Sequence, residues 1–142
     1  MAHRTGSDAD RAAGWDEELV PDPAGRTDRP DPDCPVEVAL AAVSGRWTTL
    51  VLRELMHGPL SFGLLAGRLP GISPKVLTER LTTLRERGLV AREARTGFPV
   101  RVTWSLTPAG RALRPLLIEL YRTGAELRDQ SRRTAPVPAE GV

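Results

Sequence analysis

Hydrophobic side chains recur at helical spacing through the middle of the chain and predict a series of short helices. Helices are expected at about residues 35–43, 47–57, 61–69 and 74–87, separated by Gly- and Pro-containing turns. Ser73 and Pro74 suit the start of the last of these, as N-cap and first helical residue, and Gly88 suits its end as C-cap. The third and fourth helices, joined by a turn of about four residues, are typical of a helix-turn-helix unit.

The pattern then changes from helical spacing to alternation. Val100, Val102, Trp104 and Leu106 alternate with polar residues, which predicts a half-buried strand. Together with residues 89–95 and the Gly/Pro tip between them, it forms a hairpin, or wing, at about residues 89–107.

A long helix follows from about residue 108 to residue 128, and Pro115 should bend it near Arg111. The predicted fold is mainly α with a small β-hairpin. It is a winged helix-turn-helix domain with N- and C-terminal dimerisation helices.

Composition separates this domain from its ends. Residues 1–33 contain four prolines, few apolar side chains and nine acidic against four basic residues, a net charge of −5. We expect a largely disordered acidic arm there, because so few apolar groups cannot offset the entropy of ordering. Residues 34–142 carry a net charge of +7. They divide into a domain at 34–128 and a flexible tail at 129–142.

Several function classes are excluded by what the chain lacks. No apolar run approaches the ~20 residues of a membrane helix, and residues 1–8 have no secretory pattern. The lone cysteine and two isolated histidines suggest no metal site. Phosphate-binding loops and nucleophile–base spacings are also missing. We therefore expect no enzyme and no cofactor, but a cytoplasmic, nucleoid-associated binding protein.

The helix at 74–87 has one apolar stripe, formed by Leu77, Leu81 and Leu84. Its opposite side is short, polar and suited to hydrogen bonding with base edges in the major groove. A solvated helix face would have a similar composition. The carboxylate of Glu79 would repel phosphates, yet it can accept from cytosine N4. The candidate base-reading residues are Ser73, Lys75, Thr78, Glu79 and Thr82.

Arginines supply the candidate phosphate contacts. The hairpin carries three of them around Gly97, where they fit phosphate or minor-groove contact. The alternative is a solvated basic edge that blocks strand aggregation. Two more flank the apolar stripe, and two weaker candidates lie on preceding segments. The full set is Arg92, Arg95 and Arg101, then Arg80 and Arg85, then Arg46 and Arg68.

The last helix is more apolar than a small domain should cover unaided. A symmetric pair of such helices would bury this surface and would place two recognition helices about one DNA turn apart. Alternatively, the helix only covers its own domain. The candidate dimer residues are Leu113, Leu116, Leu117, Leu120 and Tyr121.

These motifs together resemble the HxlR-type transcriptional regulators over about residues 34–124. The residues that carry the resemblance are Cys34-Pro35, Gly45-Arg46-Trp47, Leu52-Arg53-Glu54-Leu55, Gly58-Pro59, Phe62, Leu69-Pro70-Gly71-Ile72-Ser73, Lys75-Val76-Leu77-Thr78, Leu81, Leu84, Gly88-Leu89-Val90 and Ser105-Leu106-Thr107-Pro108-Ala109-Gly110. The resemblance implies a homodimeric bacterial regulator that binds promoter DNA. The family's positions correspond here to Cys34, Trp47, Lys75 and the wing at 95–101.

The chain departs from the family pattern at two places. Trp104 stands where the family often has Tyr, and Thr123 stands where it often has Trp. Both departures bear on the dimer seam and on any effector pocket.

Cys34 has two interpretations. The resemblance implies a possible redox sensor, and a helix N-terminus favours the thiolate form of a cysteine. The neighbouring Asp33 and Glu37 act in the opposite direction. The alternative is a structural N-cap packed at the dimer interface.

The leading hypothesis is therefore a sequence-specific regulator whose partners are double-stranded promoter or operator DNA and a second copy of the chain, with no membrane. The sequence names no small-molecule effector. The alternative is a winged-helix protein-interaction module, with weak non-specific DNA binding masked by the acidic arm.

Overall fold

The computed structural model describes residue 14 and residues 16–134. The chain divides into two compact units, residues 1–44 and residues 45–142. The boundary predicted between residues 33 and 34 lies inside the first unit. No helix in the described ranges is long and apolar enough to cross a membrane.

The first unit is built around helix α2 (Pro35–Val43), which begins with Pro at its first position as the sequence predicts. Residues 16–33 form turns and the short 3-10 helix η1 (Pro23–Gly25). The Asp22 carboxylate caps η1 by accepting from the Ala24 amide at 2.8 Å. Residues 1–13 and 15 of the predicted acidic arm lie outside the described residues.

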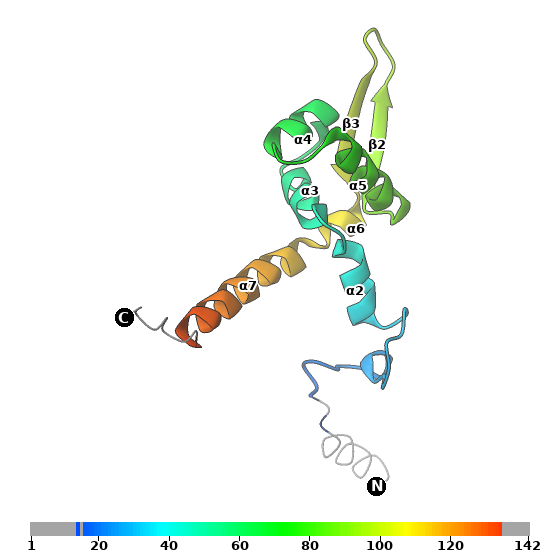
Figure 1. Cartoon of the computed structure of the whole chain (residues 1–142). Helices are drawn as coiled ribbons and strands as arrows, with labels where there is room; N and C mark the ends of the chain where they lie inside the picture. The colour runs from blue at the N-terminus through cyan, green and yellow to red at the C-terminus, as the bar shows by residue number, and fades with distance from the viewer. Residues whose placement is uncertain (1–13, 15, 135–142) are drawn as a thin grey trace, which may run out of the picture. The chain divides into compact units, whose positions relative to one another are not determined.

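The second unit has the predicted winged helix-turn-helix arrangement, with a hairpin projecting from a group of short helices (Figure 1). Three antiparallel strands form its sheet in the order β1-β3-β2. Its elements are α3 (Thr48–Leu55), β1 (Leu60–Ser61), α4 (Phe62–Arg68), α5 (Pro74–Glu86), β2 (Val90–Arg95), β3 (Arg101–Leu106), α6 (Pro108–Arg111) and α7 (Arg114–Thr134).

Strand β1 has no counterpart in the sequence prediction. Leu60 pairs with Trp104 and Ser61 with Thr103, so β1 extends the hairpin into a three-stranded sheet. Two residues are too few to show alternation, which explains why the pattern missed this strand. Ser61 is the N-cap of α4 rather than its first residue, and its hydroxyl accepts from the Leu64 amide at 3.2 Å.

The predicted helix at 108–128 is interrupted. Helix α6 ends at Arg111 and α7 begins at Arg114. Pro115 causes this break, because it has no amide hydrogen to donate to the Arg111 carbonyl. The bend predicted near Arg111 is thus confirmed.

Helix α7 continues to Thr134, beyond the end that the pattern predicts near Arg128. Residues 129–134 contain neither Pro nor Gly, and the Gln130 amide donates to the Glu126 carboxylate at 3.0 Å. The first part of the predicted tail is therefore helical, and residues 135–142 lie outside the described part of the chain.

The core of the second unit lies between α3, α4, α5 and the base of the hairpin. Its fully buried side chains include the predicted stripe of α5. They are Thr48, Val51, Leu52, Leu55, Leu65, Leu77, Leu81, Leu84 and Val90. Helix α5 ends in a left-handed Gly88 (φ +75°), and the Leu89 amide donates back to the Leu84 carbonyl at 2.9 Å. This is the glycine C-cap that the sequence predicts.

Thr107 ties the start of α6 to the end of α5. Its hydroxyl donates to the Gly88 carbonyl at 2.7 Å and accepts from the Gly110 amide at 3.1 Å. Gly110 is buried so close to the Leu89 carbonyl that a Cβ at this position would overlap it. Glycine is therefore required here by close backbone approach.

We expect Gly110→Ala to lower the free energy of unfolding by about 1–3 kcal/mol, because the added methyl must displace the Leu89 backbone just before β2. Equilibrium urea denaturation followed by circular dichroism measures this. Gly67→Ala in α4 is the matched control, because its Cβ would meet no atom within 4 Å. The control should be as stable as the wild type or gain about 0.5–1 kcal/mol. Equal stability of both variants would contradict the packing at Gly110.

Candidate nucleic-acid interface

Helix α5 is held in one rotational orientation by its buried stripe. Leu77, Leu81 and Leu84 are all fully buried. The helix starts at Ser73, whose hydroxyl oxygen accepts from the Val76 amide at 3.1 Å. Because one face is fixed inward, the opposite face is directed to solvent. Four of the predicted base-reading residues lie on this face and Ser73 lies at the start of the helix. All five are exposed: Ser73, Lys75, Thr78, Glu79 and Thr82.

The hydroxyl groups on this face differ in what they can offer a ligand. Thr78 donates to the Pro74 carbonyl at 2.9 Å, and Thr82 donates to the Thr78 carbonyl at 2.8 Å. Both hydroxyl hydrogens are therefore used within the helix, and each oxygen keeps capacity to accept. The reverse holds for Ser73, whose oxygen already accepts as the helix cap. In this conformation the two threonines suit amino donors, such as those of adenine and cytosine.

The seven candidate arginines fall into two groups. Two of them already have partners within the protein. Arg68 lies 3.6 Å from the Glu54 carboxylate, which also pairs with Arg53 at 2.9 Å. The Arg80 Nε donates to the Arg46 carbonyl at 2.6 Å, and the Arg80 side chain is half-buried. Arg80 therefore holds the backbone at residue 46, and that role differs from the predicted phosphate contact.

The other five arginines, together with Lys75, are exposed, and among the described residues their side chains make no hydrogen bond or ion pair. An unpaired cation needs no rearrangement before it meets a phosphate. This group consists of Arg46, Lys75, Arg85, Arg92, Arg95 and Arg101.

A turn ahead of α3 supports the helix-turn-helix, and sequence reasoning missed it. Trp47 adopts a left-handed conformation (φ +74°) next to Gly45 (φ +107°). The Trp47 ring lies close to Gly71 in the turn between α4 and α5, where a Cβ would come within 3.0 Å of it. Arg80 also donates to the Arg46 carbonyl in the turn ahead of α3. Only the Gly-Arg-Trp run hinted at it, because these contacts link residues distant in sequence.

The hairpin projects beyond the helices (Figure 1). Val90 and Leu106 are buried and pair with each other at its base, whereas residues 91–101 are all exposed. Helix α5 packs against β2, so the exposed hairpin begins beside α5. Arg95 and Arg101 are directly opposite each other at the far end of the ladder.

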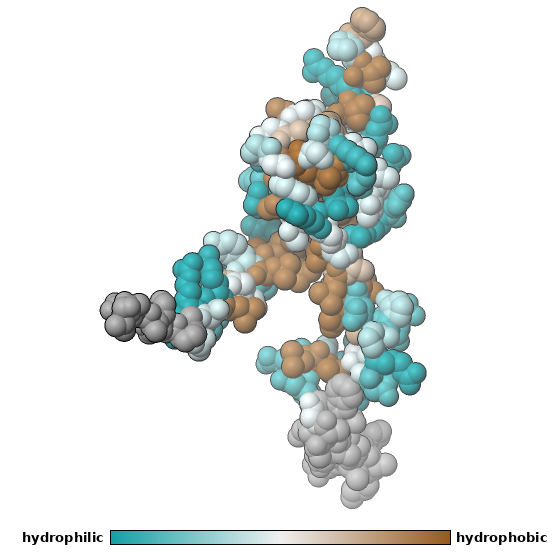
Figure 2. All heavy atoms as spheres, viewed as in Figure 1, coloured by the Kyte–Doolittle hydropathy of each residue, from teal (hydrophilic) through white to brown (hydrophobic). Residues whose placement is uncertain are grey.

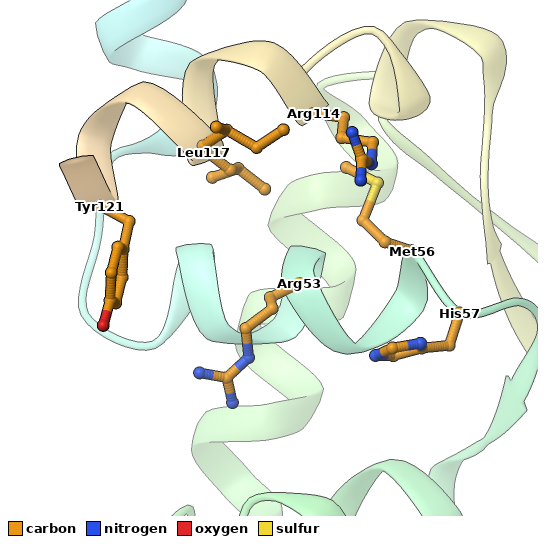
Figure 3. Close-up of a pocket in the computed structure, with 7 residues that line it drawn as sticks. Arg53, Met56, His57, Arg114, Leu117 and Tyr121 are labelled. Atoms are coloured by element: carbon orange, nitrogen blue, oxygen red, sulfur yellow. The ribbon is translucent and has the colours of Figure 1, made fainter.

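Helix α7 rests on α3 along part of one face and leaves apolar side chains outside. Leu113, Leu116 and Leu117 are half-buried, whereas Leu120, Tyr121 and Leu127 are exposed. Leu117 and Tyr121 line one side of a hollow of about 410 Å³, and Arg53, Met56 and His57 line the other (Figure 3). The hollow and the exposed part of α7 form one apolar surface with basic groups beside it.

Cys34 is only 7% exposed, and its side chain makes no capping hydrogen bond to α2. Buried thiols react slowly with oxidants, so this burial favours the structural interpretation. Redox sensing stays a prediction. No group of three or more His, Cys, Asp or Glu side chains in the described residues could hold a metal ion.

Comparison with known proteins agrees with this architecture. The HxlR-like helix-turn-helix family model matches residues 42–132. The HTH-type transcriptional regulator sll1512 of Synechocystis is 38% identical over 97 residues, which cover 68% of this chain and 72% of the relative.

Solved structures share the fold. The redox regulator HypR in its reduced form aligns with a TM-score of 0.64 at 30% identity, covering 70% of this chain and 98% of HypR. A MarR-family transcriptional regulator from Enterococcus faecalis V583 also has a TM-score of 0.64, at 33% identity, covering 76% of this chain and 98% of that one. These relatives are transcriptional regulators. The chain therefore belongs to the HxlR-like family of helix-turn-helix transcriptional regulators.

Proposed function

We propose that the protein binds double-stranded promoter or operator DNA sequence-specifically as a homodimer. In this proposal α5 lies in the major groove, with Lys75, Thr78, Glu79 and Thr82 toward the bases. Ser73 starts the helix and offers its hydroxyl hydrogen to DNA. The hairpin contacts the backbone or the minor groove of the same site.

One observation carries the proposal. The buried leucines of α5 direct a polar face outward, while the adjacent hairpin presents cations without partners among the described residues. A helix that offers both donors and acceptors can distinguish base pairs in the major groove, because each pair displays a different pattern there. Cations flanking it neutralise phosphates and fix the register.

The arginines that bind within the protein have a supporting role. Arg80 holds the Arg46 carbonyl and so fixes the turn against which α5 is placed. In doing so it leaves the Arg46 side chain exposed next to the helix-turn-helix. Arg68 contributes less to DNA binding than the hairpin arginines, because part of its charge is already offset by Glu54.

The homodimer is supported by the unpartnered apolar surface of α7. Leu120, Tyr121 and Leu127 are exposed on a helix whose inner face already packs on α3. Burying a large apolar side chain contributes about 1.5–3 kcal/mol, and a two-fold interface buries each residue twice. Helix α2 also exposes Val36, with Val38 and Leu40 nearby, which is consistent with the predicted N-terminal dimerisation helix.

We expect Lys75→Ala and Thr78→Ala to reduce discrimination between sites, and Arg95→Ala to weaken binding to all sequences alike. Duplexes of about 30 bp, selected by the wild type from a random pool, supply the probe. Lys75→Ala should lose about 1–3 kcal/mol of preference for the selected sequence, measured by mobility shift.

For Arg95→Ala, the slope of log Kd against log salt should become shallower by ~1, because one phosphate contact is lost. Arg68→Ala is the matched control, and we expect a smaller change because Arg68 is paired with Glu54. If the wild type selects no sequence even at low salt, DNA recognition is wrong.

We expect Leu120→Asp to raise the dimer dissociation constant by about 100-fold or more, since each interface would bury two carboxylates in place of two leucines. Sedimentation equilibrium measures this. Arg122→Glu places a carboxylate on the opposite face of α7, where Arg122 pairs with the exposed Glu119 at 3.0 Å. That control should remain dimeric. A wild-type chain that is monomeric at micromolar concentration would rule out the α7 seam.

A further inference from the structure

The tip of the hairpin exposes an aromatic side chain that serves no role within the described chain. Phe98 is fully exposed, and Val100 beside it is largely exposed. The hairpin is anchored at its base by Val90 and Leu106, so the tip side chains add nothing to the core. In Figure 2 hydrophobic residues stand at the tip of the hairpin and alternate with hydrophilic residues below it. Such an exposed apolar group gains free energy only when a partner covers it.

The charge next to the tip indicates the nature of this partner. Arg95 and Arg101 are paired directly across the two strands, on the same face as Glu93 and Thr103. Like charges at opposed positions destabilise a sheet by several tenths of a kcal/mol. Neither arginine has an ion pair within the described residues. A polyanion lying against this end of the hairpin would relieve the repulsion.

The length of the hairpin fits the spacing of DNA grooves. From Val90 to Arg95, β2 advances by five residue steps, or about 17 Å at ~3.3 Å per residue. The adjacent minor groove lies about half a helical turn from a helix in the major groove, which is also about 17 Å. A hairpin that starts beside α5 and runs along the DNA axis therefore brings its Arg95–Arg101 end, with the tip just beyond it, to the neighbouring minor groove.

We propose that Phe98 is a minor-groove wedge, which inserts partly between base pairs beside the half-site while Arg95 and Arg101 contact the phosphates on either side. The proposal rests on DNA binding by α5, and it adds a residue that selects sequence outside the major-groove contacts. Apolar side chains, Phe among them, act as wedges of this kind by unstacking one base step and kinking the duplex.

The wedge predicts a preference for easily unstacked flanks. Pyrimidine–purine steps such as TA deform readily, whereas A-tracts are stiff. The protein should thus favour a TA step at the flank although no side chain forms a hydrogen bond to those bases. Phe98 would determine specificity there by deformability.

The test compares wild type, Phe98→Ala and Phe98→Leu on a selected duplex that carries 2-aminopurine at the flanking step. Wild-type binding should raise 2-aminopurine fluorescence as the base unstacks, Phe98→Leu should keep part of the rise, and Phe98→Ala should lose it. Wild type should also prefer a TA flank over an A-tract flank by about tenfold, a preference absent in Phe98→Ala. Val100→Ala is the control and should retain both effects.

The outcomes separate this proposal from the function on which it rests. If Phe98→Ala matches wild type in fluorescence and flank preference, the wedge is overturned while sequence-specific binding by α5 stands. If wild type binds no duplex, both fail together. If Phe98→Ala instead alters only the sedimentation of the free protein, the tip is a protein contact and the wedge is again wrong. Because Phe98 is exposed, the variant should melt at the wild-type temperature, which excludes misfolding.

Discussion

The burial of one face of α5 is the constraint on which the rest of the site depends. Leu77, Leu81 and Leu84 have no exposed surface, so the helix cannot rotate without opening the core. A rotation of one residue position, about 100°, would move Lys75 and Thr78 off the outward face. The recognition surface is therefore defined by packing, and its polar side chains need no rigid contacts of their own.

The turn at Gly45–Trp47, just ahead of α3, also helps to fix the position of α5. The Trp47 ring rests by Gly71 between the two helices of the helix-turn-helix, while Arg80 of α5 donates to the Arg46 carbonyl. One short segment thus touches both the turn and the recognition helix. Backbone strain at a left-handed Trp is maintained by these contacts, since such a conformation persists only where the surroundings favour it. Arg80, which the sequence predicted as a phosphate contact, thus stabilises the fold instead.

The charged side chains are of two kinds: some form ion pairs within the protein, and others have no ion pair among the described residues. Glu54 engages Arg53 and Arg68 on the helical body. The hairpin instead keeps opposed arginines at its far end and an aromatic residue at its tip. Stability comes from the base of the hairpin, so its outer part is free to be shaped by a ligand. The apolar α7 surface likewise lies outside the core, where a second copy of the chain could cover it without disturbing α5.

Local signals were sufficient for most of the fold. Helical spacing, Ser73 and Gly88 predicted α5 and its ends, alternation predicted the hairpin, and Pro115 predicted a bend near Arg111, where the structure has the break before α7. These features depend on neighbours within about four residues. Strand β1, the partners of Arg68 and Arg80, and the contact of Trp47 with Gly71 depend on residues brought together from distant positions. The sequence by itself determined which residues form the outward polar face of α5 and the exposed hairpin. Only tertiary packing decided which arginines remain unpaired, because their partners are chosen by the fold and not by spacing along the chain.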